Sequence, residues 1–161
     1  MALELTVLNT SLVQKQSVNE ILKCNEVTVN FGLVLTEKQA LALVETRLFA
    51  LKENGRIEFS GGVINKIIYE FCNSFYLSMH NYEKALHELL EIFYYYKNET
   101  LDLISDDDLI KNMKTAFDGV CQGSFELLAG RELDKLARNL RYGYSLDHED
   151  DMSTEEENDD G

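Results

Sequence analysis

Apolar residues recur at intervals of three and four along much of the chain, which is the spacing of one face of an α-helix. The longest stripe of this kind lies between Asn81 and about Leu103, and its members are Tyr82, Leu86, Leu89, Phe93 and Tyr96. It is widened by Ala85, Leu90, Ile92 and Tyr94. Alternating steps of four and three are typical of a helix packed lengthwise against others, so this segment is predicted to be the central helix of the core.

Three helices are predicted before this segment. A polar helix runs from the cap residues Asn9-Thr10-Ser11 to about Glu26. The second begins at the capping box Thr36-Glu37-Lys38-Gln39 and ends at Asn54-Gly55, where glycine allows a left-handed stop. Its inward face is predicted to comprise Leu41, Val44, Leu48 and Leu51. The third helix is marked by Val63, Ile64, Ile67, Ile68 and Phe71.

Two helices are predicted after the central one. The first begins at Ser105-Asp106-Asp107-Asp108, a capping signature that places three carboxylates at the positive end of the helix dipole. Its apolar face comprises Leu109, Met113, Phe117 and Val120, and Gly119 and Gly123 weaken and then end the helix. Ser124 opens the last helix, which ends at Gly143 and whose inward residues are Phe125, Ala129, Leu133, Leu136 and Leu140.

Three segments also suit short strands. Residues 1–8 alternate weakly, as a short strand or as a lead-in to the first helix. Residues 27–35 are rich in β-branched side chains, and are either extended or the tail of a helix followed by a loop. Residues 56–59 alternate like a short strand, which either has no partner or pairs with residues 29–35 or with the N-terminal residues. The predicted fold is therefore all-α: a single helical-bundle-like domain of five to six helices over residues 1–145, with at most one short strand pair.

The composition agrees with a helical fold. The chain contains no proline, the strongest helix breaker, although an average usage of about 5% would predict about eight. Hydrophobic residues make up 45% of the chain, which is enough for a sizeable core. The cysteines Cys24, Cys72 and Cys121 are widely spaced and form no CxxC pair, so they are predicted to be buried reduced thiols.

Negative charge is concentrated at the C-terminal end. Nine of the 29 acidic residues lie in residues 146–161, which contain no lysine or arginine, so this segment is predicted to be a disordered acidic tail. The preceding residues hold 20 acidic residues against 15 basic ones, a balance that excludes general nucleic-acid binding. Neither a signal segment nor an apolar run of about 20 residues is recognisable. A cytoplasmic location without membrane contact is therefore predicted.

One set of side chains on the central helix is suited to chemistry. These residues are His80, Glu83, His87 and Glu91, and they fall within roughly 80° of one helix face. Imidazoles and carboxylates ligate metals and act as acids or bases. The two histidines are separated by about 10.5 Å of helix rise, so one metal would bind only an adjacent His–Glu pair. The face is predicted to be solvated unless another helix covers it, and no cofactor and no catalytic residue is assigned.

One basic patch is recognisable in the sequence. It comprises Arg131, Lys135, Arg138 and Arg141, within a sector of about 120° opposite the apolar face of the last helix. Amphipathic helices often carry such a face, and Glu132 and Asp134 dilute it. The functional alternatives are docking of an acidic partner or capture of the chain's own acidic tail. At Ser60-Gly61-Gly62 a connector is favoured over an anion site.

Several strings of residues carry a resemblance to a known family. They are residues 35–40 (LTEKQA), residues 54–59 (NGRIEF), and residues 92–99 (IFYYYKNE) continued by residues 117–119 (FDG). Through them, residues 1 to about 145 resemble a family of uncharacterised proteins, a domain of unknown function found mainly in anaerobic Gram-positive bacteria. The resemblance implies a helical cytosolic bacterial protein, with no activity, substrate or ligand to carry over.

Two classes of function remain open. The amphipathic helices, the oppositely charged ends and the run Phe93-Tyr94-Tyr95-Tyr96, which cannot all face one core, favour a non-enzymatic protein. Such a protein would act through protein–protein interaction, with an unknown partner or with itself. The alternative is a metal-dependent or acid–base enzyme that uses the four residues of the His–Glu face. The sequence lacks the GxSxG, P-loop, HExxH and GxGxxG signatures, which favours the first class.

Overall fold

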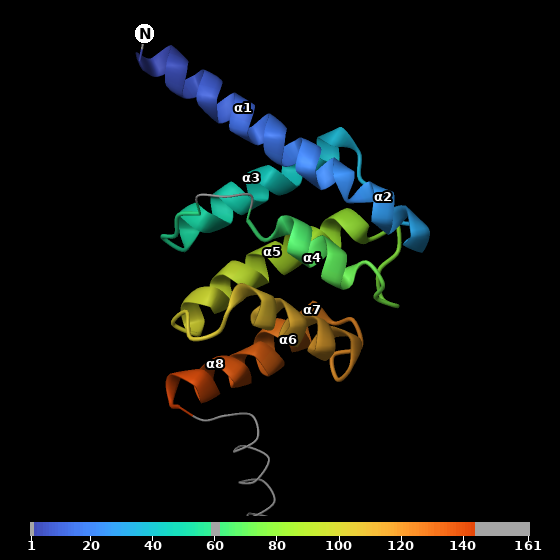
Figure 1. Cartoon of the computed structure of the whole chain (residues 1–161). Coiled ribbons are helices and arrows are strands. Elements are labelled where there is room, and N and C mark those ends of the chain that lie inside the picture. The colour runs from blue at the N-terminus through green and yellow to red at the C-terminus, as the bar shows by residue number, and fades with distance from the viewer. Residues whose placement is uncertain (1, 59–61, 144–161) are drawn as a thin grey trace, which may run out of the picture. The chain divides into compact units, whose positions relative to one another are not determined.

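The computed structural model describes residues 2–58 and 62–143, and the side chains of residues 12–58 and 62–143 (Figure 1). The chain divides into two compact units, Met1–Tyr95 and Tyr96–Gly161, and the boundary falls inside helix α5. Six helices of the described part have eight residues or more, and that part contains no strand. The all-α prediction is therefore confirmed, whereas the single-domain prediction for residues 1–145 stays a prediction.

The first unit begins with a longer helix than predicted. Helix α1 spans Ala2–Lys23, so the alternative of a strand in residues 1–8 is wrong for the residues described there. Leu5, Leu8 and Leu12 follow helical spacing, which continues into the rest of the helix and outweighs a short local alternation. The described side chains of α1 become buried at Val18 and Ile21. None of the helices in the described ranges combines the length and apolar content of a membrane span.

Residues 27–35 form a helix tail and a loop, the second of the two predicted alternatives. Helix α2 spans Asn25–Thr28 and the 3-10 helix η1 spans Val29–Phe31. The Thr28 hydroxyl donates to the Leu33 carbonyl at 2.7 Å. The Asn25 side chain donates to the Leu35 carbonyl at 2.9 Å and accepts from the Leu35 N–H at 2.8 Å. These bonds fix the backbone of the loop that follows η1.

Helix α3 spans Glu37–Glu53, and its predicted capping box is present. The Thr36 hydroxyl accepts the Gln39 N–H, and the Gln39 side chain accepts the Thr36 N–H. The predicted inward face is only half right, because Val44 and Leu51 are buried whereas Leu41 and Leu48 are exposed. The buried face consists of Ala40, Leu43, Val44, Arg47, Ala50 and Leu51. It includes Arg47, a residue that hydrophobic periodicity assigns to water and that here forms an ion pair with Glu58.

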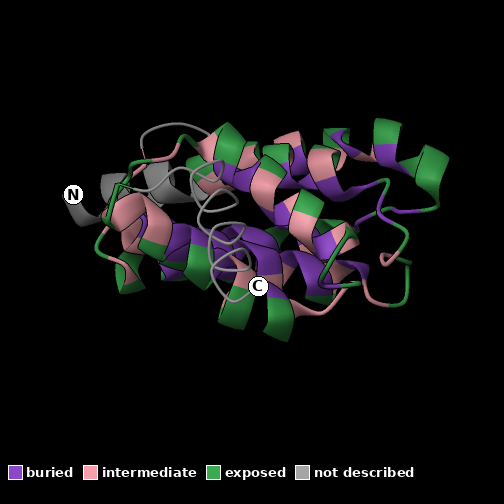
Figure 2. Cartoon of the chain, turned by 90° about the horizontal axis from the view of Figure 1, so that it is seen from below, coloured by how far each residue is buried: buried purple, intermediate pink, exposed green. Residues whose placement is uncertain are grey.

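Helices α4 and α5 complete the first unit. Helix α4 spans Ile64–Phe71 and α5 spans Tyr82–Glu99, and both bury the apolar stripes predicted for them. On the helices in Figure 2, buried stretches alternate with exposed ones, as amphipathic helices require. Residues 56–58 are irregular rather than a strand, and Phe59 lies outside the described residues. Helix α5 ends at Glu99 rather than near Leu103, because Leu101 and Asp102 adopt left-handed backbone angles.

The second unit contains the end of α5, helix α6 (Asp106–Asp118), helix α7 (Phe125–Leu127), the π-helical turn η2 (Leu128–Glu132) and helix α8 (Leu133–Arg141). The predicted caps at Ser105 and Ser124 are confirmed. The last helix buries Leu128, Leu133, Leu136 and Ala137, so Ala129 and Leu140 are less enclosed than predicted. The wider π-helical turn shifts the inward face at its start. Val120 follows the end of α6 and is exposed.

Candidate functional site

The structure brings two residues of the predicted His–Glu face together and adds a third. His87 Nε2 lies 3.1 Å from Glu83 Oε2 on the same helix, and His87 Nδ1 lies 2.7 Å from Thr46 Oγ1 on α3. The side chains of His87 and Glu83 are 27% and 35% exposed, so α3 covers the face in part. His80 and Glu91 are exposed. Within the described ranges, no group of three or more His, Cys, Asp or Glu residues is arranged to hold a metal ion.

This Thr46–His87–Glu83 relay links hydroxyl, imidazole and carboxylate. With its proton on Nε2, the imidazole donates to Glu83 and accepts the Thr46 hydroxyl proton at Nδ1. The same order of groups activates hydroxyl nucleophiles in hydrolases. Thr46 and His87 nevertheless lie inside helices, where backbone N–H groups are bonded along the helix and do not point at a shared oxyanion position. The relay therefore joins α3 to α5 and leaves the imidazole half-exposed.

A second polar cluster, which the sequence did not indicate, adjoins the relay on α3. Glu58 Oε1 accepts Arg47 Nε at 2.9 Å and Arg47 Nη2 at 2.8 Å. The fully buried Tyr94 donates its hydroxyl to the same oxygen at 2.7 Å. Burial, together with this hydrogen bond to a carboxylate, raises the pKa of Tyr94 far above its usual value, so the phenol remains a donor. The cluster ties the connector between α3 and α4 to both α3 and α5.

Gly62 fits closely against this ion pair. Its φ is +73°, and a Cβ there would overlap the Arg47 guanidinium and the Glu58 carboxylate. Both the backbone angle and the lack of space therefore require glycine. Ser60 and Gly61 of the predicted connector lie outside the described residues. The close packing against Arg47 and Glu58 thus explains why this connector has a glycine at position 62.

Four exposed apolar residues of the first unit lie at the end of η1 and in the loops that follow η1 and α4, and we refer to them together as the apolar face: Phe31, Val34, Phe75 and Met79. The Val34 N–H contacts Met79 Sδ at 3.3 Å, which joins the loop after η1 to the loop between α4 and α5. Phe75 is 92% exposed and Phe31 is 50% exposed. Val27 and Val29 are also exposed.

Phe75 belongs to a loop that is fixed by its own hydrogen bonds. The Asn81 side chain donates to the Tyr76 carbonyl at 3.0 Å and accepts the Ser78 N–H at 2.8 Å. The Ser74 hydroxyl accepts the Tyr76 N–H at 3.2 Å. The Phe75 and Tyr76 rings make an edge contact with centroids 5.6 Å apart. The phenyl ring is thus presented to solvent by an ordered loop.

The predicted basic patch lies on the exposed side of η2 and α8. Arg131 pairs with Glu132 at 3.0 Å and Arg138 pairs with Asp134 at 3.4 Å, and Lys135 is exposed. Arg141 is different, because its Nη1 donates to the carbonyl and to the carboxylate of Glu99, both at 3.0 Å. Three members of the patch therefore face solvent, and the fourth holds the end of α8 to the end of α5.

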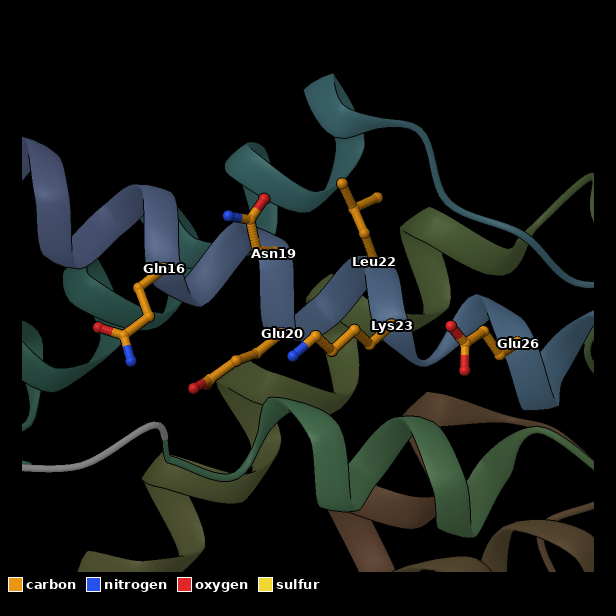
Figure 3. Close-up of a pocket in the computed structure, with 6 residues that line it drawn as sticks. All are labelled: Gln16, Asn19, Glu20, Leu22, Lys23 and Glu26. Atoms are coloured by element: carbon orange, nitrogen blue, oxygen red, sulfur yellow. The ribbon is translucent and has the colours of Figure 1, made fainter.

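A shallow depression of about 550 Å³ lies along α1 and the start of α2 (Figure 3). It is lined by Gln16, Asn19, Glu20, Leu22, Lys23 and Glu26. Figure 3 shows Gln16, Glu20 and Lys23 extending to one side of the helix, and Asn19 and Leu22 to the other. Ligand sites need a few polar groups that converge on one point, and this lining diverges.

All three cysteines are buried and carry free thiols. Burial raises the pKa of Cys24 and of Cys121, which disfavours the reactive thiolate. The hydroxyl of the buried Tyr82 has no hydrogen-bond partner in the described part of the chain, and burial raises the pKa of Tyr82 to about 12. These groups are part of the core.

Among known protein families, the model of a family of unknown function, DUF6323, matches residues 20–146. Neither the curated proteins nor the solved structures yielded a match. The expected resemblance to an uncharacterised family is therefore confirmed, and its range in anaerobic Gram-positive bacteria stays a prediction.

Proposed function

The chain belongs to DUF6323, a family of unknown function, and we propose that it is a non-enzymatic protein that binds a protein partner through its apolar face. The observation that carries this proposal is Phe75, a large apolar side chain held 92% exposed by an ordered loop. Aromatic side chains of this kind are enriched among the residues that dominate binding energy at interfaces. A cytoplasmic location is part of the proposal.

The size of the apolar face supports an interface rather than a chance exposure. A phenylalanine side chain carries on the order of 200 Å². With the exposed fractions of 92% for Phe75, 50% for Phe31, 48% for Met79 and 38% for Val34, these four residues together expose roughly 400 Å² of surface. The largest patch on a typical monomer is about 300–600 Å² and is often functional. A surface of this size suits the apolar centre of a standard interface, which buries about 800 Å² on each partner.

Site-specific photocrosslinking tests the proposal. A benzoylphenylalanine at position 75 is expected to crosslink a discrete protein, or a second copy of the chain, in the native host. The same probe at Ile57, which is 78% exposed on the α3–α4 connector, is the matched control and is expected to give no such product. Met79→Ser should abolish the product from position 75, and Phe75→Ser should weaken binding of the identified protein by roughly 30-fold or more, the loss typical of an interface hot spot.

The proposal fails on either of two results. One is the absence of any crosslinked protein from position 75 combined with a monomer in sedimentation at all concentrations. The other is a product of equal yield from positions 75 and 57, because such labelling would follow exposure and not an interface.

Acid–base chemistry is the second candidate, since the Thr46 hydroxyl lies 2.7 Å from His87 Nδ1. An activated hydroxyl would attack an ester carbonyl and pass its proton to His87, while the alcohol leaves and water later releases the acyl group. p-Nitrophenyl acetate is the probe. A burst of nitrophenol with acetylation of Thr46, lost in Thr46→Val, would favour this candidate, and equal rates for the native chain and His87→Gln would remove it.

A further inference from the structure

The exposed bases near the C-terminal end form a surface that is only loosely neutralised. The side chains of Arg131 and Arg138 are 54% and 59% exposed, and each forms an ion pair with a carboxylate one or four residues away. Exposed ion pairs of this kind contribute little to stability. Another carboxylate can therefore replace the present one at little cost. We call Arg131, Lys135 and Arg138 the basic face of α8.

Helix α8 is followed by a left-handed glycine, Gly143. The Gly143 N–H donates to the Leu140 carbonyl at 3.2 Å, and Gly143 has a φ of +79°. A left-handed residue after the last turn ends a helix and redirects the chain. Arg141 is left out of the basic face because its Nη1 already donates to the carbonyl and the carboxylate of Glu99.

The residues after Gly143 carry a charge that matches the basic face. Residues 144–161 hold nine carboxylates and no lysine or arginine. The basic face extends along about 10 Å of helix, from residue 131 to residue 138, whereas eight extended residues reach about 26 Å. Asp147–Asp151 are therefore near enough for Arg138 and Lys135, and Glu155–Asp160 for Arg131.

We propose that the acidic segment 144–161 binds the basic face of α8 within the same chain. The short connection to α8 gives the segment an effective concentration in the millimolar range, so weak ion pairs suffice for occupancy. Because the pairs are exposed to solvent, salt screens them. The segment would thereby compete with any external acidic partner for Arg131, Lys135 and Arg138.

Paramagnetic relaxation tests the contact in the full chain. A nitroxide is attached to Ser153→Cys, which is selective because the native thiols are buried. Signal loss is expected at the amides of residues 131–138 at about 10 mM salt, where the Debye length is about 30 Å, and at most half of it at about 1 M, where that length is about 3 Å. The amides of residues 108–115 on α6 serve as the internal reference.

Two variants identify the partners of the segment. The triple variant Arg131→Gln, Lys135→Gln and Arg138→Gln is expected to abolish the signal loss, and so is neutralisation of Asp147, Glu149, Asp150 and Asp151 by amides, which leaves α8 intact. The control variant Lys84→Gln, Lys111→Gln and Lys114→Gln changes the net charge by the same amount and is expected to retain the signal loss. The inference is overturned if the native chain shows no loss at low salt, if α6 is affected as strongly as α8, or if the α8 variant retains the effect.

Discussion

Two buried tyrosines on one helix provide a paired test of the packing. Tyr82 and Tyr94 are 1% and 0% exposed, and both lie on α5. The Tyr94 hydroxyl donates to Glu58 at 2.7 Å, whereas the Tyr82 hydroxyl has no partner among the described residues. Replacing each by phenylalanine removes one oxygen and leaves the ring in place. The perturbation is chemically the same at both sites, and only the hydroxyl environment differs.

The two substitutions are expected to change the free energy of unfolding in opposite directions. A hydrogen bond to a charged group contributes about 1.5–3 kcal/mol. Because Glu58 Oε1 keeps two bonds from Arg47, the lower end applies, and Tyr94→Phe should cost about 1.5 kcal/mol. At Tyr82 the buried hydroxyl has lost its water without gaining a bond, so Tyr82→Phe should stabilise the protein by up to about 1 kcal/mol.

Urea unfolding followed by circular dichroism measures both changes. The urea concentration at the unfolding midpoint should fall for Tyr94→Phe and rise or stay unchanged for Tyr82→Phe. The slope of the unfolding free energy against urea concentration should remain that of the native chain. An unchanged slope shows that the surface exposed on unfolding is the same in both variants. An equal loss of unfolding free energy in the two variants would refute the reasoning, since the hydrogen bond from Tyr94 to Glu58 would then make no contribution of its own.

Three further results are expected. Gly62→Ala should lower the free energy of unfolding, measured in urea, clearly more than Gly55→Ala does. Both glycines have positive φ, but only Gly62 lacks space for a Cβ, so equal losses would contradict the argument from crowding. Thr36→Ala should cost about 1 kcal/mol in the same assay, through loss of the capping box, and no change would contradict that role. Above pH 10 unfolded tyrosines ionise while the raised pKa values keep Tyr82 and Tyr94 protonated, so stability falls as the pH rises, by about 1 kcal/mol per group between pH 10 and 11. The stability of each phenylalanine variant should fall less steeply over this range in urea titrations, and equal slopes would contradict the raised pKa values.

Features encoded by neighbouring residues could be predicted from the sequence. The caps at Thr36 and Ser105 depend on residues three positions away, and both are present. The stripe of α5 is long enough to define one inward face, and its members are buried. Helix type and approximate bounds follow from such short-range patterns. Periodicity places the end of α5 too late because that end depends on the left-handed residues Leu101 and Asp102, which no local signal marks.

The polar clusters depend on residues that are distant in the sequence. Thr46 and His87 are 41 positions apart, and Glu58 and Tyr94 are 36 positions apart. Periodicity treats an arginine as a surface residue, so it does not assign Arg47 to the inward face of α3. One signal is present: Leu43, Val44, Ala50 and Leu51 leave position 47 as the missing member of an apolar stripe. The apolar face could not be predicted because Phe75 lies in an irregular loop without periodicity.

Two adjacent residues of α3 determine how that helix is aligned with α5. Thr46 bonds to His87, and Arg47 shares the Glu58 oxygen with Tyr94. A slip of one helical turn, about 5.4 Å, would break both links at once and leave a guanidinium enclosed without a counter-ion. An uncompensated enclosed charge costs several kcal/mol, whereas leucine and valine side chains tolerate such a slip far better. Misaligned packings are thus disfavoured. Thr46 and Arg47 favour one register between α3 and α5, two helices whose other buried residues are mostly apolar.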